Sequence, residues 1–145
     1  MGRFYEQVMG VYFDDLDAFF ILHNARYLLL FERTLGSFWQ ELGFVGHAPE
    51  HPDDPHEHSH LVRSNAIEYL RPVRGTGKVR VRVWIQKLGR TSMTIGFRIL
   101  PLHEDVDYAV GHRVVVRIDP ATYRPAPWTD AFRELIRPWV SEGGT

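Results

Sequence analysis

The chain has 145 residues, the length of one ordinary domain. Apolar residues make up 44% of it and charged residues 24%, which excludes a disordered or fibrous chain. It has no cysteine, so disulfides, cysteine–zinc sites and a cysteine nucleophile are excluded. No apolar stretch is long enough for a signal peptide or a membrane span, so we expect a cytoplasmic protein with no membrane partner.

The charge is unevenly distributed, although the net charge is only −1. Residues 1–60 carry three arginines and ten acids, whereas residues 71–98 carry eight basic residues and no acid. A basic segment of this kind can bind phosphates or an acidic partner, and the alternative is the solvated face of a strand pair. No nucleic-acid motif accompanies it, so no nucleic-acid partner is expected.

The first predicted element is a strand over residues 4–13, and a helix over residues 24–43 follows it. Asn24 is the predicted N-cap of this helix. Leu29 and Leu30 fall off the apolar stripe and suggest a second packing surface such as a subunit contact. The stripe itself consists of apolar side chains at three- and four-residue spacing: Tyr27, Leu28, Phe31, Leu35, Phe38, Trp39 and Leu42.

The next segment, residues 46–60, is rich in proline, histidine and acids and predicts a mobile loop. It contains side chains that could bind zinc or nickel, but alternate spacing on a loop fixes no coordination geometry. We therefore expect no metal site and no cofactor. The side chains concerned are Asp53, Asp54, His56, His58 and His60.

Four further strands and a short helix complete the chain. The strands are predicted at residues 61–70, 79–85, 93–99 and 112–118, and the last three alternate apolar with polar residues, so we expect their apolar faces to be buried. Thr129 can cap a helix over residues 130–136, within a C-terminal segment at 128–140. The order of elements indicates an α+β fold in which the helix lies across a curved antiparallel sheet.

Three carboxylates, Asp14, Asp15 and Asp17, lie where the first strand ends, just before the helix begins at Asn24. Such crowding favours an unusual carboxylate pKa, and a helix start supplies free backbone N–H groups. Together these are the parts of an acyl-transfer site, in which a carboxylate acts as nucleophile or general base and an N–H group polarises a carbonyl. The alternative is a polar strand end followed by a capped helix.

The same stretch resembles the signature of the 4-hydroxybenzoyl-CoA thioesterase group of hotdog-fold acyl-CoA thioesterases. That signature reads roughly Asp-x-Asp-x-x-Gly-x-x-x-Asn-x-x-Tyr, followed by an aromatic residue and an acid. The similarity covers about residues 5–127 and includes the segments 67–72, 77–78, 87–92 and 113–120. The matching signature residues here are Asp15, Asp17, Asn24, Tyr27, Phe31 and Glu32.

The resemblance implies a single hotdog domain over residues 1–145, with a long central helix wrapped by a curved antiparallel sheet of about five strands. It also implies that Asp17 attacks the thioester carbonyl of an acyl-CoA, or activates a water to do so, while a backbone N–H near Asn24 holds the oxyanion. Phe20, His23 and Tyr27 are the expected substrate contacts, and Glu68 is expected to contact substrate at the site of the neighbouring subunit. Phe20 departs from the signature, which has glycine there, and His23 replaces an asparagine or an aromatic residue.

Active sites in this family lie between subunits, so the resemblance also implies a homo-oligomer, either a dimer or a homotetramer. The partner chain would present its hairpin, with Lys87, Arg90, Thr91 and Ser92, to the pantetheine arm and the phosphates of coenzyme A. An acyl-carrier-protein thioesterase, a non-catalytic acyl-CoA-binding protein and a dimeric scaffold that uses the histidine-rich loop remain the alternatives.

Overall fold

The computed structural model describes residues 2–44 and 59–141. Two α-helices, two 3-10 turns and five strands make up this part of the chain. In chain order they are β1 (Tyr5–Val11), η1 (Phe13–Asp15), α1 (Asn24–Glu41), β2 (His60–Tyr69), β3 (Gly77–Leu88), β4 (Ser92–Pro101), β5 (Ala109–Arg117), α2 (Asp130–Ile136) and η2 (Arg137–Trp139).

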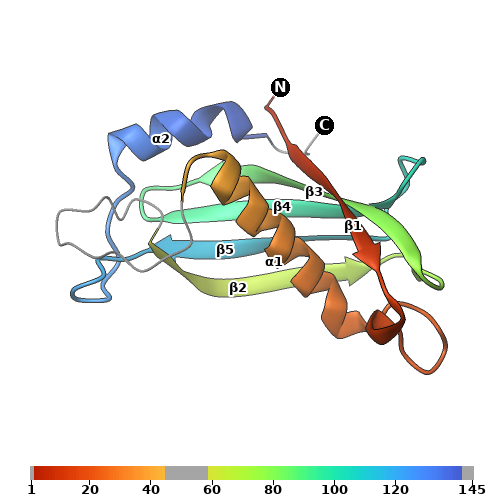
Figure 1. Cartoon of the computed structure of the whole chain (residues 1–145). Helices are drawn as coiled ribbons and strands as arrows, with labels where there is room; N and C mark the ends of the chain where they lie inside the picture. Colours follow the sequence, from red (N-terminus) through yellow and green to blue (C-terminus); the bar gives the residue numbers. More distant parts are fainter. Residues whose placement is uncertain (1, 45–58, 142–145) are drawn as a thin grey trace.

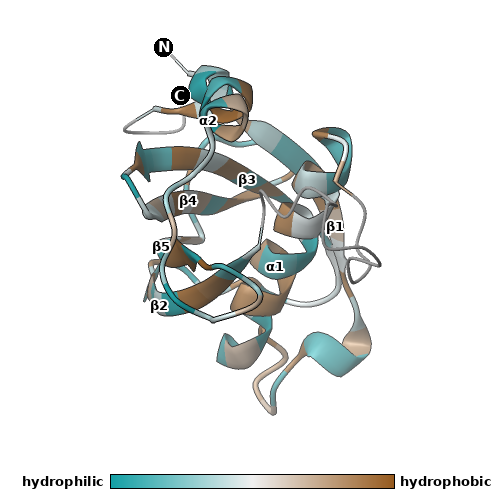
Figure 2. Cartoon of the chain, turned by 90° about the vertical axis from the view of Figure 1, so that its left-hand side faces the viewer, coloured by the Kyte–Doolittle hydropathy of each residue, from teal (hydrophilic) through white to brown (hydrophobic). Residues whose placement is uncertain are grey.

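The five strands form one sheet in the order β1-β3-β4-β5-β2, and every neighbouring pair is antiparallel. Helix α1 lies across one face of this sheet (Figure 1). Hydrophobic residues recur along α1, β3, β4 and β5, which enclose the core (Figure 2). The expected α+β architecture with five antiparallel strands is confirmed. None of the helices in the described residues is long and apolar enough to cross a membrane.

Helix α1 has 18 residues and ends two residues before the predicted boundary. Its N-cap is His23 rather than Asn24, because the Nδ1 atom of His23 accepts a hydrogen bond of 3.0 Å from the N–H of Ala25. Leu30 is 4% exposed, so it packs in the core of this chain and not in a subunit contact. The buried face consists of Tyr27, Leu30, Phe31, Thr34, Leu35 and Phe38.

Strand β5 buries the face opposite to the predicted one. Arg113 and Val115 point toward α1 and are buried, whereas the apolar residues that alternate with them are only half-buried. The guanidinium of Arg113 lies 5.0 Å from the centre of the Phe31 ring and donates hydrogen bonds to Glu32 (3.0 Å) and Asn65 (2.8 Å). These partners make the burial of an arginine tolerable.

The structure describes the end of the predicted loop and the whole of the C-terminal helix. His60, which the sequence pattern places in the loop, begins β2 instead. The other candidate metal ligands of the loop, Asp53, Asp54, His56 and His58, lie outside the described residues. Helix α2 spans the predicted residues 130–136, and the Oγ1 atom of Thr129 caps it by accepting from the N–H of Phe132 at 3.1 Å.

Candidate active site

The chain leaves β1 through a short turn that Asp15 stabilises. The Oδ2 atom of Asp15 accepts a hydrogen bond of 2.8 Å from the N–H of Tyr12, and its Oδ1 atom lies 3.8 Å from the Nε atom of Arg26. The side chain of Arg26 also donates to the carbonyl of Asp14. The carboxylate of Asp15 is therefore used to join this turn to the first turn of α1.

Asp17 organises the tight loop that follows. Its Oδ1 atom accepts hydrogen bonds from the N–H groups of Phe19 (2.8 Å) and Ile21 (3.4 Å), and its own N–H donates to the carbonyl of Ile21 (2.9 Å). Within the described residues, its Oδ2 atom has no hydrogen-bond donor. One oxygen thus fixes the orientation of the carboxylate and the other remains available for chemistry.

One cavity of about 300 Å³ brings Asp17 together with the start of α1. Two segments far apart in the sequence line it. The first runs from the loop into the helix and the second follows the end of β2. The lining residues are Asp17, Ile21, Leu22, Asn24 and Tyr27 from the first segment, and Tyr69, Leu70, Arg71 and Pro72 from the second.

The first turn of α1 contributes Asn24, whose backbone N–H is free within the described part of the chain, to the lining of this cavity. The N–H of Ala25 donates to the Nδ1 atom of His23, and the N–H of Arg26 donates to the His23 carbonyl at 2.9 Å. The N–H of Asn24 has no acceptor among the residues that the structure describes. Because a helix start also carries a partial positive charge, this N–H is suited to bind an oxygen that gains negative charge.

Tyr27 forms the buried wall of the cavity and is only 3% exposed. Burial raises its pKa above 10.0, although a hydrogen bond from the backbone of Val73 lowers it, and the nearby Asp17 carboxylate adds to the increase. The phenol is therefore neutral at physiological pH. The ring packs edge-on against Tyr69, with 4.9 Å between the ring centroids.

Tyr69 and Arg71 line the same cavity, although no role is predicted for either from the sequence. The hydroxyl of Tyr69 donates to the carbonyl of Asn24 at 3.1 Å. The guanidinium of Arg71 donates to the carbonyls of Val106 and Asp107 and lies 5.0 Å from the ring centre of Tyr108. The motif over residues 67–72 covers both residues, but it predicts only a strand and does not indicate that they line a cavity.

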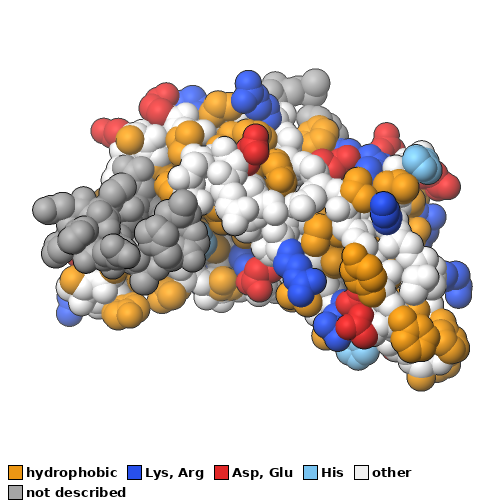
Figure 3. Space-filling view, viewed as in Figure 1, with side chains coloured by type: hydrophobic (Ala, Val, Ile, Leu, Met, Phe, Trp, Pro, Cys, Tyr) orange, Lys and Arg blue, Asp and Glu red, His pale blue; other side chains and the backbone are white. Residues whose placement is uncertain are grey.

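Phe20 and His23, two of the expected substrate contacts, do not line this cavity. Phe20 is 62% exposed and has a φ of 59°, in the left-handed region that glycine adopts without strain. This backbone conformation explains why the signature has glycine at that position. Phe20 belongs to a group of exposed aromatic side chains over the segment after β1, at the lower right of Figure 3: Tyr12, Phe13, Phe19 and Phe20.

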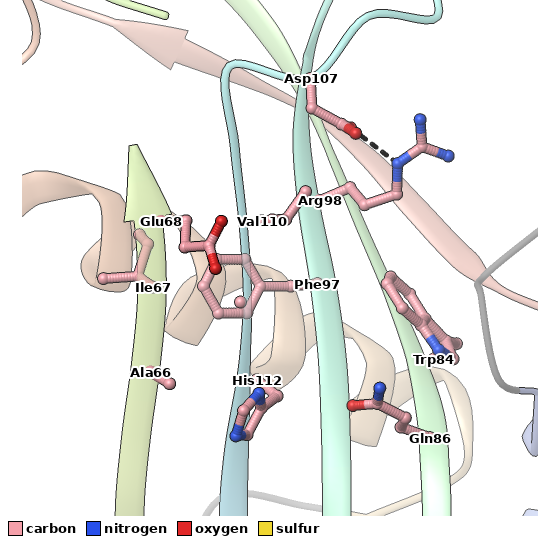
Figure 4. Close-up of a pocket in the computed structure, with 11 residues that line it drawn as sticks. Ala66, Ile67, Glu68, Trp84, Gln86, Phe97, Arg98, Asp107, Val110 and His112 are labelled. Carbon is pink, nitrogen blue, oxygen red and sulfur yellow. Dashed lines mark hydrogen bonds and ion pairs between the residues drawn. The ribbon is translucent and has the colours of Figure 1, made fainter. Parts of the chain in front are cut away.

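Glu68 lies on the opposite face of the sheet from Asp17. Successive side chains of a strand point to opposite faces, and its neighbour Tyr69 points toward α1. Glu68 borders a separate open cavity of about 580 Å³. Figure 4 shows it there with His112 and Trp84. Within one chain, Glu68 therefore cannot contact a substrate held by Asp17.

The hairpin residues also lie far from Asp17 within one chain. Strand β3 starts beside the end of β1, where Val11 pairs with Gly77, and ends eleven residues later at Leu88. At about 3.3 Å per residue this separates the two ends by roughly 35 Å. Figure 1 shows the β3–β4 connection at the opposite end of the sheet from the start of α1. The residues concerned are Lys87, Arg90, Thr91 and Ser92.

Part of the basic segment is neutralised within the chain. Acids outside the segment pair with three of its arginines, and the bond from Arg80 lowers the pKa of Asp105. Within the described residues no ion pair joins the exposed Lys87 or Arg90, so these two remain available for an anion. The pairs are Arg80 and Arg82 with Glu6, Arg80 with Asp105, and Arg98 with Asp107.

Comparisons with known proteins match nearly the whole chain. A family model of the thioesterase-like superfamily matches residues 11–136, whereas no curated protein matches the chain. A predicted thioesterase from Bacillus stearothermophilus has a TM-score of 0.80 and 22% identity, covering 97% of this chain and 99% of that chain. A thioesterase from Thermus thermophilus, complexed with coenzyme A and Zn, has a TM-score of 0.74 and 30% identity, covering 95% and 93%. A 1,4-dihydroxy-2-naphthoyl-CoA thioesterase from Synechocystis has a TM-score of 0.77 and 12% identity, covering 92% and 96%.

These matches define the class of protein as a thioester hydrolase. Because the family model covers most of its length, the chain belongs to the thioesterase-like superfamily. No group of three histidine, aspartate or glutamate side chains that could hold a metal ion occurs in residues 2–44 and 59–141.

Proposed function

We propose that this thioester hydrolase is a hotdog-fold acyl-CoA thioesterase whose reaction centre is the cavity between Asp17 and Asn24. The observation that carries the proposal is that Asp17, whose carboxylate has one free oxygen, and Asn24, whose helix-start N–H is unpaired among the described residues, line the same cavity. The apolar and aromatic wall, with Leu22, Tyr27 and Leu70, suits a hydrophobic or aromatic acyl group.

In the proposed reaction the thioester carbonyl oxygen accepts a hydrogen bond from the N–H of Asn24. The Oδ2 atom of Asp17 then attacks the carbonyl carbon, and coenzyme A leaves as a thiolate, so that an acyl anhydride is left for water to hydrolyse. Alternatively, Asp17 takes a proton from a water that attacks the same carbon. Either path consumes one water and releases the free acid and the thiol. The oxyanion is stabilised in both.

A second copy of the chain is part of this proposal. Strand β2 is an edge strand whose residues are mostly exposed, including Leu61 (50%) and Val62 (49%), whereas the other edge strand, β1, is largely covered. If two β2 strands pair antiparallel about a two-fold axis, His60 of one copy lies beside Tyr69 of the other. The hairpin is at the His60 end of the sheet, because His60 pairs with Arg117 and Ser92 with Val116.

This pairing places the hairpin end of one copy at the Asp17 end of the other. Lys87 and Arg90 would then meet the phosphates of coenzyme A. The coenzyme A complex of the Thermus thermophilus relative supports coenzyme A as the ligand. An acyl-carrier-protein thioester is the second candidate, since the same two cations would meet an acidic carrier protein. The mass of the assembly distinguishes a dimer from the homotetramer that the resemblance implies.

The test compares thiol release from aromatic, short-chain and long-chain acyl-CoAs by the wild type and by Asp17→Asn. Asparagine keeps an acceptor oxygen for the N–H groups of Phe19 and Ile21, so the loop is retained while the nucleophile or base is lost. We expect turnover to fall by about 10²-fold or more. Asp14→Asn is the matched control, because Asp14 is exposed and lies outside the cavity.

Equal turnover by the wild type and Asp17→Asn would remove Asp17 from the mechanism. A wild type that is inactive on every acyl-CoA but active on acyl carrier protein would replace the substrate and keep the site. Binding of acyl-CoA without hydrolysis of either thioester would establish the non-catalytic alternative.

A further inference from the structure

The N–H of Asn24 can stabilise an oxyanion only if the first turn of α1 is held in a fixed position. The local capping interactions do little to hold it there. The N-cap His23 is itself exposed, and no acidic side chain lies in the first turn. Arg26 connects this turn only to Asp14 and Asp15, which belong to the loop and not to the sheet. A displacement of about 1 Å at such a site can cost roughly 10²-fold in rate.

Within residues 2–44 and 59–141, one side chain of the sheet donates a hydrogen bond to this turn from the far side of the cavity. Tyr69, the last residue of β2, donates its hydroxyl to the carbonyl of Asn24 at 3.1 Å. That carbonyl is also positioned to accept the helical hydrogen bond from Leu28, and its two lone pairs allow both. The bond joins residues 45 positions apart, so it fixes the helix start relative to the sheet.

The ring of Tyr69 is itself held in place. It packs edge-on against Tyr27, which is 3% exposed and hydrogen-bonded to the backbone of Val73. The segment that follows Tyr69 is anchored as well, because the N–H groups of Leu70 and Arg71 both donate to the carbonyl of Tyr108. Tyr69 is 48% exposed, so the ring contact with Tyr27 and the bond of its hydroxyl to Asn24, rather than burial, hold its two rotatable side-chain angles.

We infer that Tyr69 is a positioning residue of the proposed thioesterase site: its hydroxyl, bonded to the carbonyl of Asn24, holds the Asn24 N–H in place to polarise the thioester carbonyl. The inference rests on the proposed function. Tyr69 does not take part in the chemistry, and it acts only through the backbone of Asn24.

The first test is Tyr69→Phe, which removes the hydroxyl and keeps the ring against Tyr27. We expect kcat to fall about five- to twentyfold, while KM for the acyl-CoA stays within about twofold and the Tm stays close to that of the wild type. Tyr123→Phe is the matched control, because Tyr123 is 70% exposed and lies outside the cavity. It is expected to change none of these quantities.

The second test observes the polarised carbonyl directly. An acyl-CoA labelled with ¹³C at the thioester carbonyl is bound to Asp17→Asn, in which hydrolysis is slow, and its stretching band is recorded by difference infrared spectroscopy. A hydrogen bond from Asn24 lowers the frequency of this band relative to the free thioester. We expect the band to move back toward the free frequency in Asp17→Asn/Tyr69→Phe, which a purely structural contribution of Tyr69 to folding would not produce.

The outcomes separate this inference from the function on which it rests. If the wild type hydrolyses no thioester, the proposed function fails. If the wild type is active and Tyr69→Phe leaves kcat and the carbonyl band unchanged, the function stands and the role of Tyr69 is overturned. A rise in KM or a drop in Tm with no movement of the band would overturn it too, because Tyr69 would then bind substrate or support the fold.

Discussion

Phe20 adopts a backbone conformation that side chains normally avoid. Its φ of 59° costs a residue with a Cβ atom about 1–2 kcal/mol relative to right-handed conformations. The loop imposes this angle through the bonds around it, since the N–H of Phe20 donates to the carbonyl of Asp17 and the N–H of Gly75 donates to the carbonyl of Phe20. The same bonds hold Asp17 in its cavity, so the strain accompanies the geometry of the site.

Because of this strain, glycine is expected to be more stable than alanine at position 20, which is the reverse of the usual order. At Phe20, glycine relieves the left-handed backbone and alanine does not, so Phe20→Gly is expected to be more stable than Phe20→Ala by about 1 kcal/mol. The measurement is the free energy of unfolding from chemical denaturation. Phe19 is the matched control, because it is 82% exposed and has no positive φ. There we expect Phe19→Ala to be the more stable by about 0.5–1 kcal/mol; the same order at both positions would contradict a strained Phe20.

At the scale of elements, α1 was predictable because its stabilising contacts are periodic and lie within one segment. The phase of its stripe was less certain, since apolar side chains lie on both sides of it. The structure buries Leu30 and the polar Thr34, whose hydroxyl donates to the carbonyl of Leu30, and leaves Trp39 half-buried. Hydropathy alone cannot choose among several apolar faces.

The sequence predicts the position of strand β5 correctly but assigns the wrong face to the core. Tertiary contacts decide which face of this strand is buried. Alternation predicts that Val114 and Val116 face the core, yet Arg113 itself is buried because Phe31, Glu32 and Asn65 supply its partners. These partners come from α1 and β2. A sequence pattern contains no information about such partners.

The candidate site also contains two kinds of residue: some are placed there by the local sequence and others only by the tertiary fold. Asp17 and Asn24 are seven positions apart, and their common location at a strand end and a helix start follows from local sequence. Tyr69 reaches Asn24 only after the sheet has formed, so its hydrogen bond has no signal in either segment alone. The hairpin and Glu68 were placed at the site by resemblance, and one chain cannot bring them there.

Substitution by alanine is expected to have opposite effects on the stability of the protein at two glycines, one in β4 and one in α1. A Cβ atom on Gly96 of β4 would lie 2.5 Å from the ring of Trp84, which is 5% exposed and covers the glycine from the neighbouring strand. Gly96→Ala is therefore expected to destabilise the protein by about 1–3 kcal/mol. A Cβ atom on Gly36 of α1 would meet nothing within 4 Å, so Gly36→Ala is expected to stabilise the helix by about 0.5–1 kcal/mol. Thermal and chemical unfolding of both variants provides the check, and a stabilising Gly96→Ala would mean that Trp84 moves freely.

At the scale of the whole molecule, the two edges of the sheet differ in what covers them. Only one of the seven residues of β1 is exposed, whereas eight of the ten residues of β2 are. An uncovered edge strand with exposed apolar side chains readily pairs with another strand. The asymmetry therefore favours β2 as the edge at which a second copy would bind, and β2 also ends in the wall of the Asp17 cavity.

A charge introduced on each edge tests this assignment. Leu61 on β2 and Val8 on β1 are both 50% exposed, so Leu61→Asp and Val8→Asp make the same change on opposite edges. If two copies pair along β2 with His60 beside Tyr69, position 61 lies opposite Glu68 of the second copy. Leu61→Asp is therefore expected to shift the assembly toward monomers by light scattering, because two carboxylates would face each other across the paired strands. Thiol release should fall together with the assembled fraction and recover at higher protein concentration, since the partner's hairpin completes the coenzyme A site. Val8→Asp is expected to preserve both mass and activity, and a loss of assembly in Val8→Asp alone would move the interface to β1.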